Sequence, residues 1–91
     1  MNLGDYKIGN KWVKLEDLMG VSLDSENGYT IQNKGYFVLQ ACSQETQPNE
    51  EKQGFYILTN QSFGYTKKTG TDFLWLKAYQ KNTTIVVQEG L

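Results

Sequence analysis

The stretch Gly28-Tyr-Thr-Ile-Gln-Asn-Lys-Gly-Tyr-Phe-Val-Leu-Gln-Ala41 decides the fold class of this chain. Two extended segments flank Asn33-Lys34-Gly35, a pattern that predicts a β-hairpin. The pattern returns near the C-terminus, where residues 73–79 and 83–89 flank Gln80-Lys-Asn82. The sequence therefore predicts successive hairpins, rather than helices or βαβ units, and an all-β protein.

The remaining residues form short extended segments with turn signals about ten residues apart, the spacing of a β-sandwich or small barrel. We expect a single domain, residues 1–91, that folds as a small antiparallel sandwich or barrel of six to eight strands. Apolar spacing of i, i+3, i+4 at residues 15–19 predicts one short helical turn that Gly20 ends, with a first strand as the alternative. A flexible arm is expected at residues 1–10. A mobile loop is expected at residues 43–53, which contain no apolar residue and the only proline.

Side chains alternate between two faces along both predicted hairpins. In the first, Phe37, Leu39 and Ala41 share the face that we expect to meet the core. In the second, both faces are partly apolar, with Leu74, Leu76 and Ala78 on one and Phe73, Trp75, Lys77 and Tyr79 on the other. We therefore expect one face to be buried in the core and the other to be partly covered by a neighbour.

The composition argues against several functional classes. The chain has no histidine, so neither a Ser-His-Asp nor a Cys-His arrangement can be built. Cys42 is the only cysteine, which excludes an intramolecular disulfide and favours a small buried residue. Nine lysines, no arginine and ten acidic residues are atypical of a nucleic-acid-binding protein. No apolar run approaches the ~20 residues of a membrane span, so we expect no membrane partner.

The carboxylates occur as local pairs in polar stretches, which is typical of a solvated surface rather than of an acid–base pair. The spacing of Asp24, Glu26 and Asn27 does not match an EF-hand loop, and the glycines fit no phosphate-binding motif. We therefore predict no enzyme activity, no metal site and no cofactor.

The tyrosines and tryptophans are more numerous than a small core needs. Such amphipathic rings lie at the rim of a core, anchor subunit interfaces or stack on sugars. The candidates for contact with a partner subunit or a glycan are Tyr36, Tyr65, Phe73, Trp75 and Tyr79.

In its order of motifs the chain resembles the small β-rich structural modules of tailed-bacteriophage virions. The resemblance rests on Tyr29-Thr-Ile-Gln-Asn33, a polar loop with a proline, and Leu74-Trp-Leu-Lys-Ala78, and it covers residues 28–89. The chain departs from the family pattern at Lys77, where an arginine is common.

The resemblance implies a head, neck, tail or fibre component, assembled in the host cytoplasm and located in the virion. Such a component works by self-association, and we expect a cyclic homo-oligomer such as a trimer that also docks to other virion proteins. The alternative is a carbohydrate-binding or host-attachment module that presents Tyr36, Tyr65 or Trp75 to a glycan.

Overall fold

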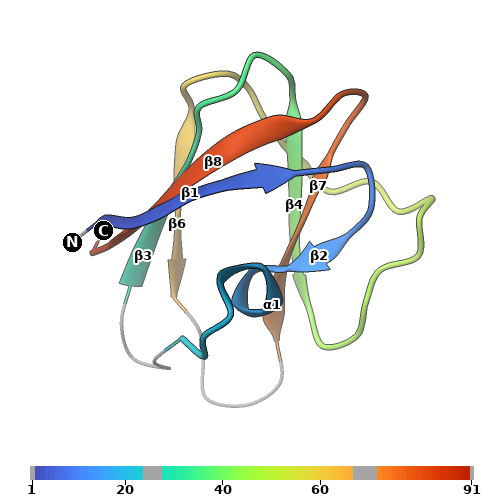
Figure 1. Cartoon of the computed structure of the whole chain (residues 1–91). Coiled ribbons are helices and arrows are strands. Elements are labelled where there is room, and N and C mark those ends of the chain that lie inside the picture. Colours follow the sequence, from blue (N-terminus) through green and yellow to red (C-terminus); the bar gives the residue numbers. More distant parts are fainter. Residues whose placement is uncertain (1, 24–27, 67–71, 91) are drawn as a thin grey trace.

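The computed structural model describes residues 2–23, 28–66 and 72–90, which form eight strands and one short helix (Figure 1). The strands are β1 (Asn2–Ile8), β2 (Val13–Lys14), β3 (Gly28–Asn33), β4 (Leu39–Gln44), β5 (Phe55–Ile57), β6 (Ser62–Thr66), β7 (Phe73–Ala78) and β8 (Thr83–Glu89). They form two antiparallel four-stranded sheets, ordered β1-β8-β3-β6 and β2-β7-β4-β5. The predicted all-β fold is confirmed; of the two expected architectures it is the sandwich, and its eight strands are within the expected six to eight.

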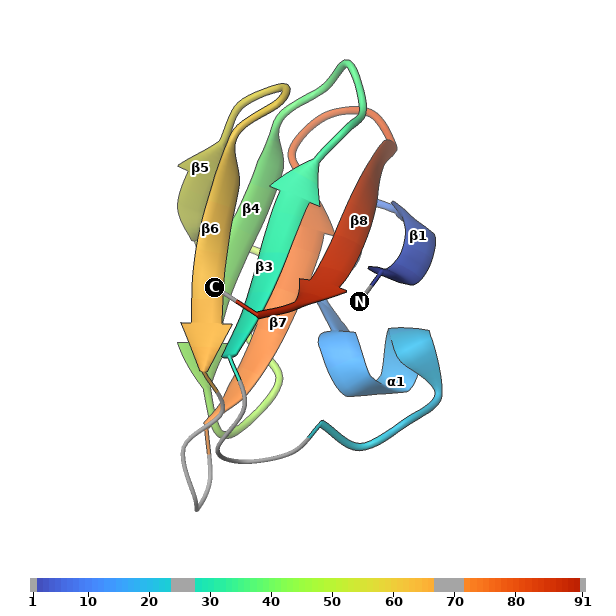
Figure 2. The same cartoon turned by 90° about the vertical axis from the view of Figure 1, so that its left-hand side faces the viewer.

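Strands that follow each other in the sequence occupy matching positions in the two sheets. When the two strand orders are compared position by position, β1 corresponds to β2, β8 to β7, β3 to β4 and β6 to β5. Figure 2 shows β3 against β4 and β6 against β5 in the two layers. Only β4 and β5 are consecutive strands of one sheet, so every other connection passes from one sheet to the other.

The core lies between the sheets and is built by alternate residues of the strands. Leu39 and Ala41 are buried there, and so is the face of β7 that carries Leu74, Leu76 and Ala78. The opposite sheet contributes Ile31, Ile85 and Val87, each fully buried. Burying each large aliphatic side chain stabilises the fold by roughly 1.5–3 kcal/mol.

The predicted helical turn is confirmed as α1 (Leu15–Met19). Leu15 anchors it in the core, and Gly20 ends it in the left-handed region at φ 73° with its N–H bonded to the Glu16 carbonyl at 2.9 Å. A residue with a Cβ is strained in this conformation, which explains the glycine.

The two predicted hairpins are wrong in their pairing. β3 pairs with β8 and β6, whereas β4 pairs with β7 and β5, so residues 34–38 cross between the sheets; residues 79–82 do the same between β7 and β8. Gly35 does not have the positive φ that a tight hairpin turn uses. It is small because a Cβ there would lie 2.0 Å from Thr83 Oγ1.

Two smaller expectations also change. Most of the expected flexible arm is strand β1, whose residues pair with β8 from Asn2 to Ile8. Apolar and polar residues alternate only weakly in that segment. It becomes a strand because it can pair with the edge of β8, and its sequence pattern alone does not indicate this. Phe37, expected in the core, precedes the start of β4 and has 40% of its surface exposed.

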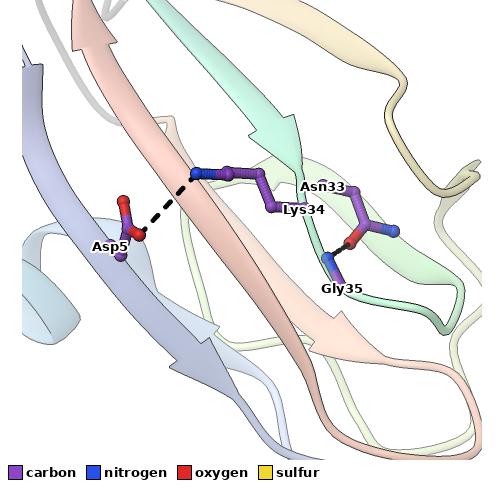
Figure 3. A network of polar contacts seen from close by, with 4 residues as sticks. All are labelled: Asp5, Asn33, Lys34 and Gly35. Carbon is purple, nitrogen blue, oxygen red and sulfur yellow. Dashed lines mark hydrogen bonds and ion pairs between the residues drawn. The ribbon is translucent and has the colours of Figure 1, made fainter.

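The side chain of Asn33, at the end of β3, is fully buried and joins both sheets. Its Nδ2 donates to the carbonyls of Phe37 and Ile57, each at 2.9 Å. Its Oδ1 accepts from the Gly35 N–H at 3.1 Å (Figure 3) and from the Thr83 hydroxyl at 2.7 Å. One amide thus satisfies four polar groups from three segments of the chain, namely the β3–β4 connection, β5 and β8.

We expect Asn33→Ala to lower the free energy of unfolding by about 3 kcal/mol, because it leaves several buried polar groups without partners. Urea denaturation followed by circular dichroism measures the loss. Gln80→Ala is the matched control, since that side chain is exposed at the same end of the sandwich. Equal stability of the two variants would contradict the role of the Asn33 amide.

Candidate functional site

Five large side chains are exposed at one end of the sandwich, where the β3–β4, β5–β6 and β7–β8 connections gather (top of Figure 1). Tyr36 is 91% exposed, and the others are between 40% and 52% exposed. We call this surface the aromatic end, and it consists of Tyr36, Phe37, Tyr56, Leu58 and Tyr79.

Contacts between the three connections hold the aromatic end together. The rings of Tyr56 and Tyr79 meet with centroids 5.2 Å apart. The N–H of Tyr79 donates to the Val38 carbonyl at 3.0 Å, and Lys81 Nζ lies 5.3 Å from the centroid of the Phe37 ring. These contacts join β5, the β7–β8 connection and the β3–β4 connection, so Tyr56, Tyr79 and Phe37 lie on one surface. Tyr36 is the neighbour of Phe37 in the same connection.

The hydrogen bonds of Asn33 hold in place the backbone that carries this surface. Its side chain binds the backbones of Phe37 and Ile57, and its own backbone carbonyl accepts from Asn60 N–H at 2.7 Å. Lys34, next to it, reaches across β8 to Asp5 of β1, with 3.9 Å between Nζ and Oδ2 (Figure 3). The exposed rings therefore sit on a backbone that the core already holds in place.

The structure does not bring the five predicted contact residues together. Tyr36 and Tyr79 belong to the aromatic end, whereas Phe73 begins β7 at the opposite end of the sandwich. Tyr65 is half-buried near Phe73, and burial, with the carboxylates of Glu16 and Asp72, raises the pKa of its hydroxyl. Trp75 is only 7% exposed and contacts its own chain.

Three residues of the aromatic end were not candidates from the sequence. Phe37 was assigned to the core, and Tyr56 and Leu58 were read as ordinary strand residues. For Tyr56 and Leu58 the available signal is their position just before the turn at residues 59–61, where a strand ends and its last side chains lose their neighbours.

A second aromatic cluster lies on the outer face of the β2-β7-β4-β5 sheet and consists of Trp12, Cys42 and Trp75, with Phe73 packed beside them. The β4–β5 loop, residues 45–54, is bonded to this cluster. Trp12 Nε1 donates to the Asn49 carbonyl at 3.1 Å, and Lys77 Nζ donates to the Glu50 carbonyl at 2.6 Å. The second apolar face of β7 is thus covered mainly by the chain itself.

The same loop was expected at residues 43–53. Ser43 and Gln44 instead belong to β4, and Trp75 Nε1 donates to the Gln44 carbonyl at 3.0 Å. Pro48, in the middle of the loop, is buried. The loop therefore packs against the sheet, and its mobility stays a prediction.

An open groove of about 580 Å3 lies on the side of the sandwich where β5 and β6 form adjacent edges. It exists because β5 pairs only with Leu39, Gln40 and Ala41, so the sheets part beyond that point. Ile57 and Phe63 line it, and Phe55, 78% exposed, stands at its rim. Its lining suits an apolar side chain rather than an ion.

Among the described residues, no three His, Cys, Asp or Glu side chains are placed to hold a metal ion. Asp24, Glu26 and Asn27 lie outside the described residues. In the same described part of the chain, no helix is long and apolar enough to cross a membrane.

Cys42 gives a test of the packed loop. Burial raises the pKa of its thiol, with the charge of Lys52 opposing the shift, so less thiolate forms at a given pH. We expect a thiol reagent at about pH 8 to label the native protein at least tenfold more slowly than the urea-unfolded protein. Equal labelling rates would show that the loop leaves the sheet readily.

Comparisons with models of known protein families, with curated proteins and with solved structures found no significant match to this chain.

Proposed function

We propose that this protein is a non-enzymatic structural component of a bacteriophage virion that acts by self-association and by docking to other virion proteins. The observation that carries the proposal is the aromatic end, where five large exposed side chains from β5 and three connections gather. The virion setting comes from the motif resemblance of residues 28–89.

An exposed cluster of this kind favours burial against another protein. Aromatic side chains are enriched at interfaces because they remove much apolar area from water and lose few rotamers. Small soluble proteins rarely keep large contiguous apolar patches exposed without a partner. The Asn33 hydrogen bonds also position the backbone before binding, which lowers the entropic cost of association.

A structural role is consistent with the chemistry that the chain offers. Without histidine, its carboxylates and lysines are the groups available for proton transfer, and the described members of the carboxylate pairs lie at the surface. We propose that the protein assembles in the host cytoplasm into a closed ring such as a trimer, which then becomes part of the virion.

We expect Tyr36→Asp to weaken self-association at least tenfold, because it places a charge in the centre of the buried contact without touching the core. Sedimentation velocity over a concentration series measures the change. Phe55→Ala is the matched control, since it removes an exposed ring from the side of the sandwich. A wild-type protein that stays monomeric at millimolar concentration would remove the proposal.

A carbohydrate-binding or host-attachment module is the second candidate, and the 91% exposure of the Tyr36 ring favours it. A flat, solvent-facing ring stacks on a sugar, and amides such as Gln53, which bonds to the Tyr56 hydroxyl, are suited to sugar hydroxyls. Trp75 does not fit this role because it is nearly buried.

A glycan-array measurement distinguishes the two proposed functions. Carbohydrate binding predicts that the wild type retains a glycan and that Tyr36→Ala loses it while the oligomer stays intact. A structural role predicts no retained glycan. Glycan binding that survives Tyr36→Ala would exclude this residue as the contact.

A further inference from the structure

Charged residues are separated between the two ends of the sandwich. The connections at the aromatic end carry Lys34 and Lys81, and residues 33–40, 55–66 and 77–84 contain no Asp or Glu. The β1–β2 connection adds Lys11, because Gly9 and Asn10 bond to the β7 end and the β7–β8 connection through Ala78 and Gln80.

The opposite end carries carboxylates. α1 lies there (bottom of Figure 1), as do the start of β7 and the ends of β4 and β8. We call this surface the acidic end, and it consists of Glu16, Asp17, Glu45, Asp72 and Glu89. The sequence segments outside the described residues cancel in formal charge, with Asp24 and Glu26 against Lys67 and Lys68.

The acidic end is also hollowed. An open groove of about 590 Å3 lies beside α1, and its lining includes Glu16, Asp17, Val21 and Phe73. Lys14 also lines it, with its Nζ 3.9 Å from the centroid of the Phe73 ring, so the charged side chains of the lining are two carboxylates and one lysine. Val21 is 54% exposed, so the groove offers an apolar contact between its carboxylates. A protruding ring with lysines beside it and a groove with an excess of carboxylates are complementary in charge.

We infer that the partner of the aromatic end is the acidic end of a second copy of this chain, so that copies associate head to tail. This inference rests on the proposed function, because it names the occupant of the same docking surface. Contact between two aromatic ends would instead bring Lys81 of each copy together with no carboxylate opposite, and partial burial makes that repulsion more costly. A head-to-tail contact places Lys11 and Lys81 against Asp17 and Asp72.

The geometry has a consequence for assembly. A head-to-tail contact uses two different surfaces of each copy, so it leaves one free docking surface at each end of a growing chain of copies. It closes into a ring when the rotation per copy allows, and otherwise continues as a filament. A two-fold dimer of aromatic ends would stop at two copies.

The test uses two variants that each lose one surface. The aromatic-end variant is Tyr36→Asp with Lys81→Glu, and the acidic-end variant is Asp17→Lys with Asp72→Lys; all four side chains are exposed. Each variant alone is expected to associate at least tenfold more weakly than the wild type. Mixed in equal amounts, they are expected to form a 1:1 heterodimer, because one intact surface of each kind remains, and native mass spectrometry identifies it.

Two controls accompany the mixture. Glu51→Lys makes the same change of charge on the β4–β5 loop and is expected to leave association unchanged. Raising the salt concentration from about 0.1 to 1 M shortens the screening length from ~10 to ~3 Å and is expected to weaken wild-type association. Circular dichroism identifies a variant that fails to fold, and Lys81→Gln and Asp17→Asn then replace the double variants.

The outcomes distinguish the inference from the proposed function. Wild-type association of the acidic-end variant alone would overturn the head-to-tail contact and leave the aromatic end as a two-fold interface. A monomeric wild type would overturn both. So would binding of wild-type monomers to anionic lipid vesicles that the aromatic-end variant loses, since the occupant would then be a membrane surface.

Discussion

The buried amide of Asn33 is the interaction on which the rest of the structure depends. It lies where β3 leaves one sheet, and it bonds to the backbones of Phe37 and Ile57 and to the Thr83 hydroxyl. The hydrogen bonds to the Ile57 carbonyl and the Thr83 hydroxyl are buried, so losing them would cost the desolvation of those groups. Because the same groups position the connections above the core, one side chain both closes the sandwich and presents the exposed rings.

Much of the fold could be predicted from the sequence, because side chains alternate between the two faces of a strand whatever the order of the strands in the sheet. Leu74, Leu76 and Ala78 were assigned correctly to one face of a strand from spacing alone. Strand pairing was not assigned correctly. A glycine shortly after Asn33 indicates a hairpin in the sequence, whether it is needed for a positive φ or because a larger side chain would not fit. At Gly35 the reason is room beside Thr83, and this depends on β8, a strand far along the sequence.

The candidate site was harder to predict, because the exposure of a ring depends on what the rest of the chain places over it. Trp75 and Tyr36 look equally available in the sequence. Trp12, Cys42 and Phe73 pack against Trp75, which is 7% exposed, whereas Tyr36 is 91% exposed. The separation of charge between the two ends could not be predicted from the sequence either, because it depends on where α1 and the strand ends lie in the fold.

The alternation of the chain between the two sheets bears on how the protein folds. Since only β4 and β5 are sequence neighbours within one sheet, neither sheet can form early from local hairpins. Most pairings must wait for distant segments to meet, and such topologies fold slowly, in milliseconds to seconds. Both layers then appear together in a single cooperative transition, and a nascent chain gains little order before β8 has been synthesised.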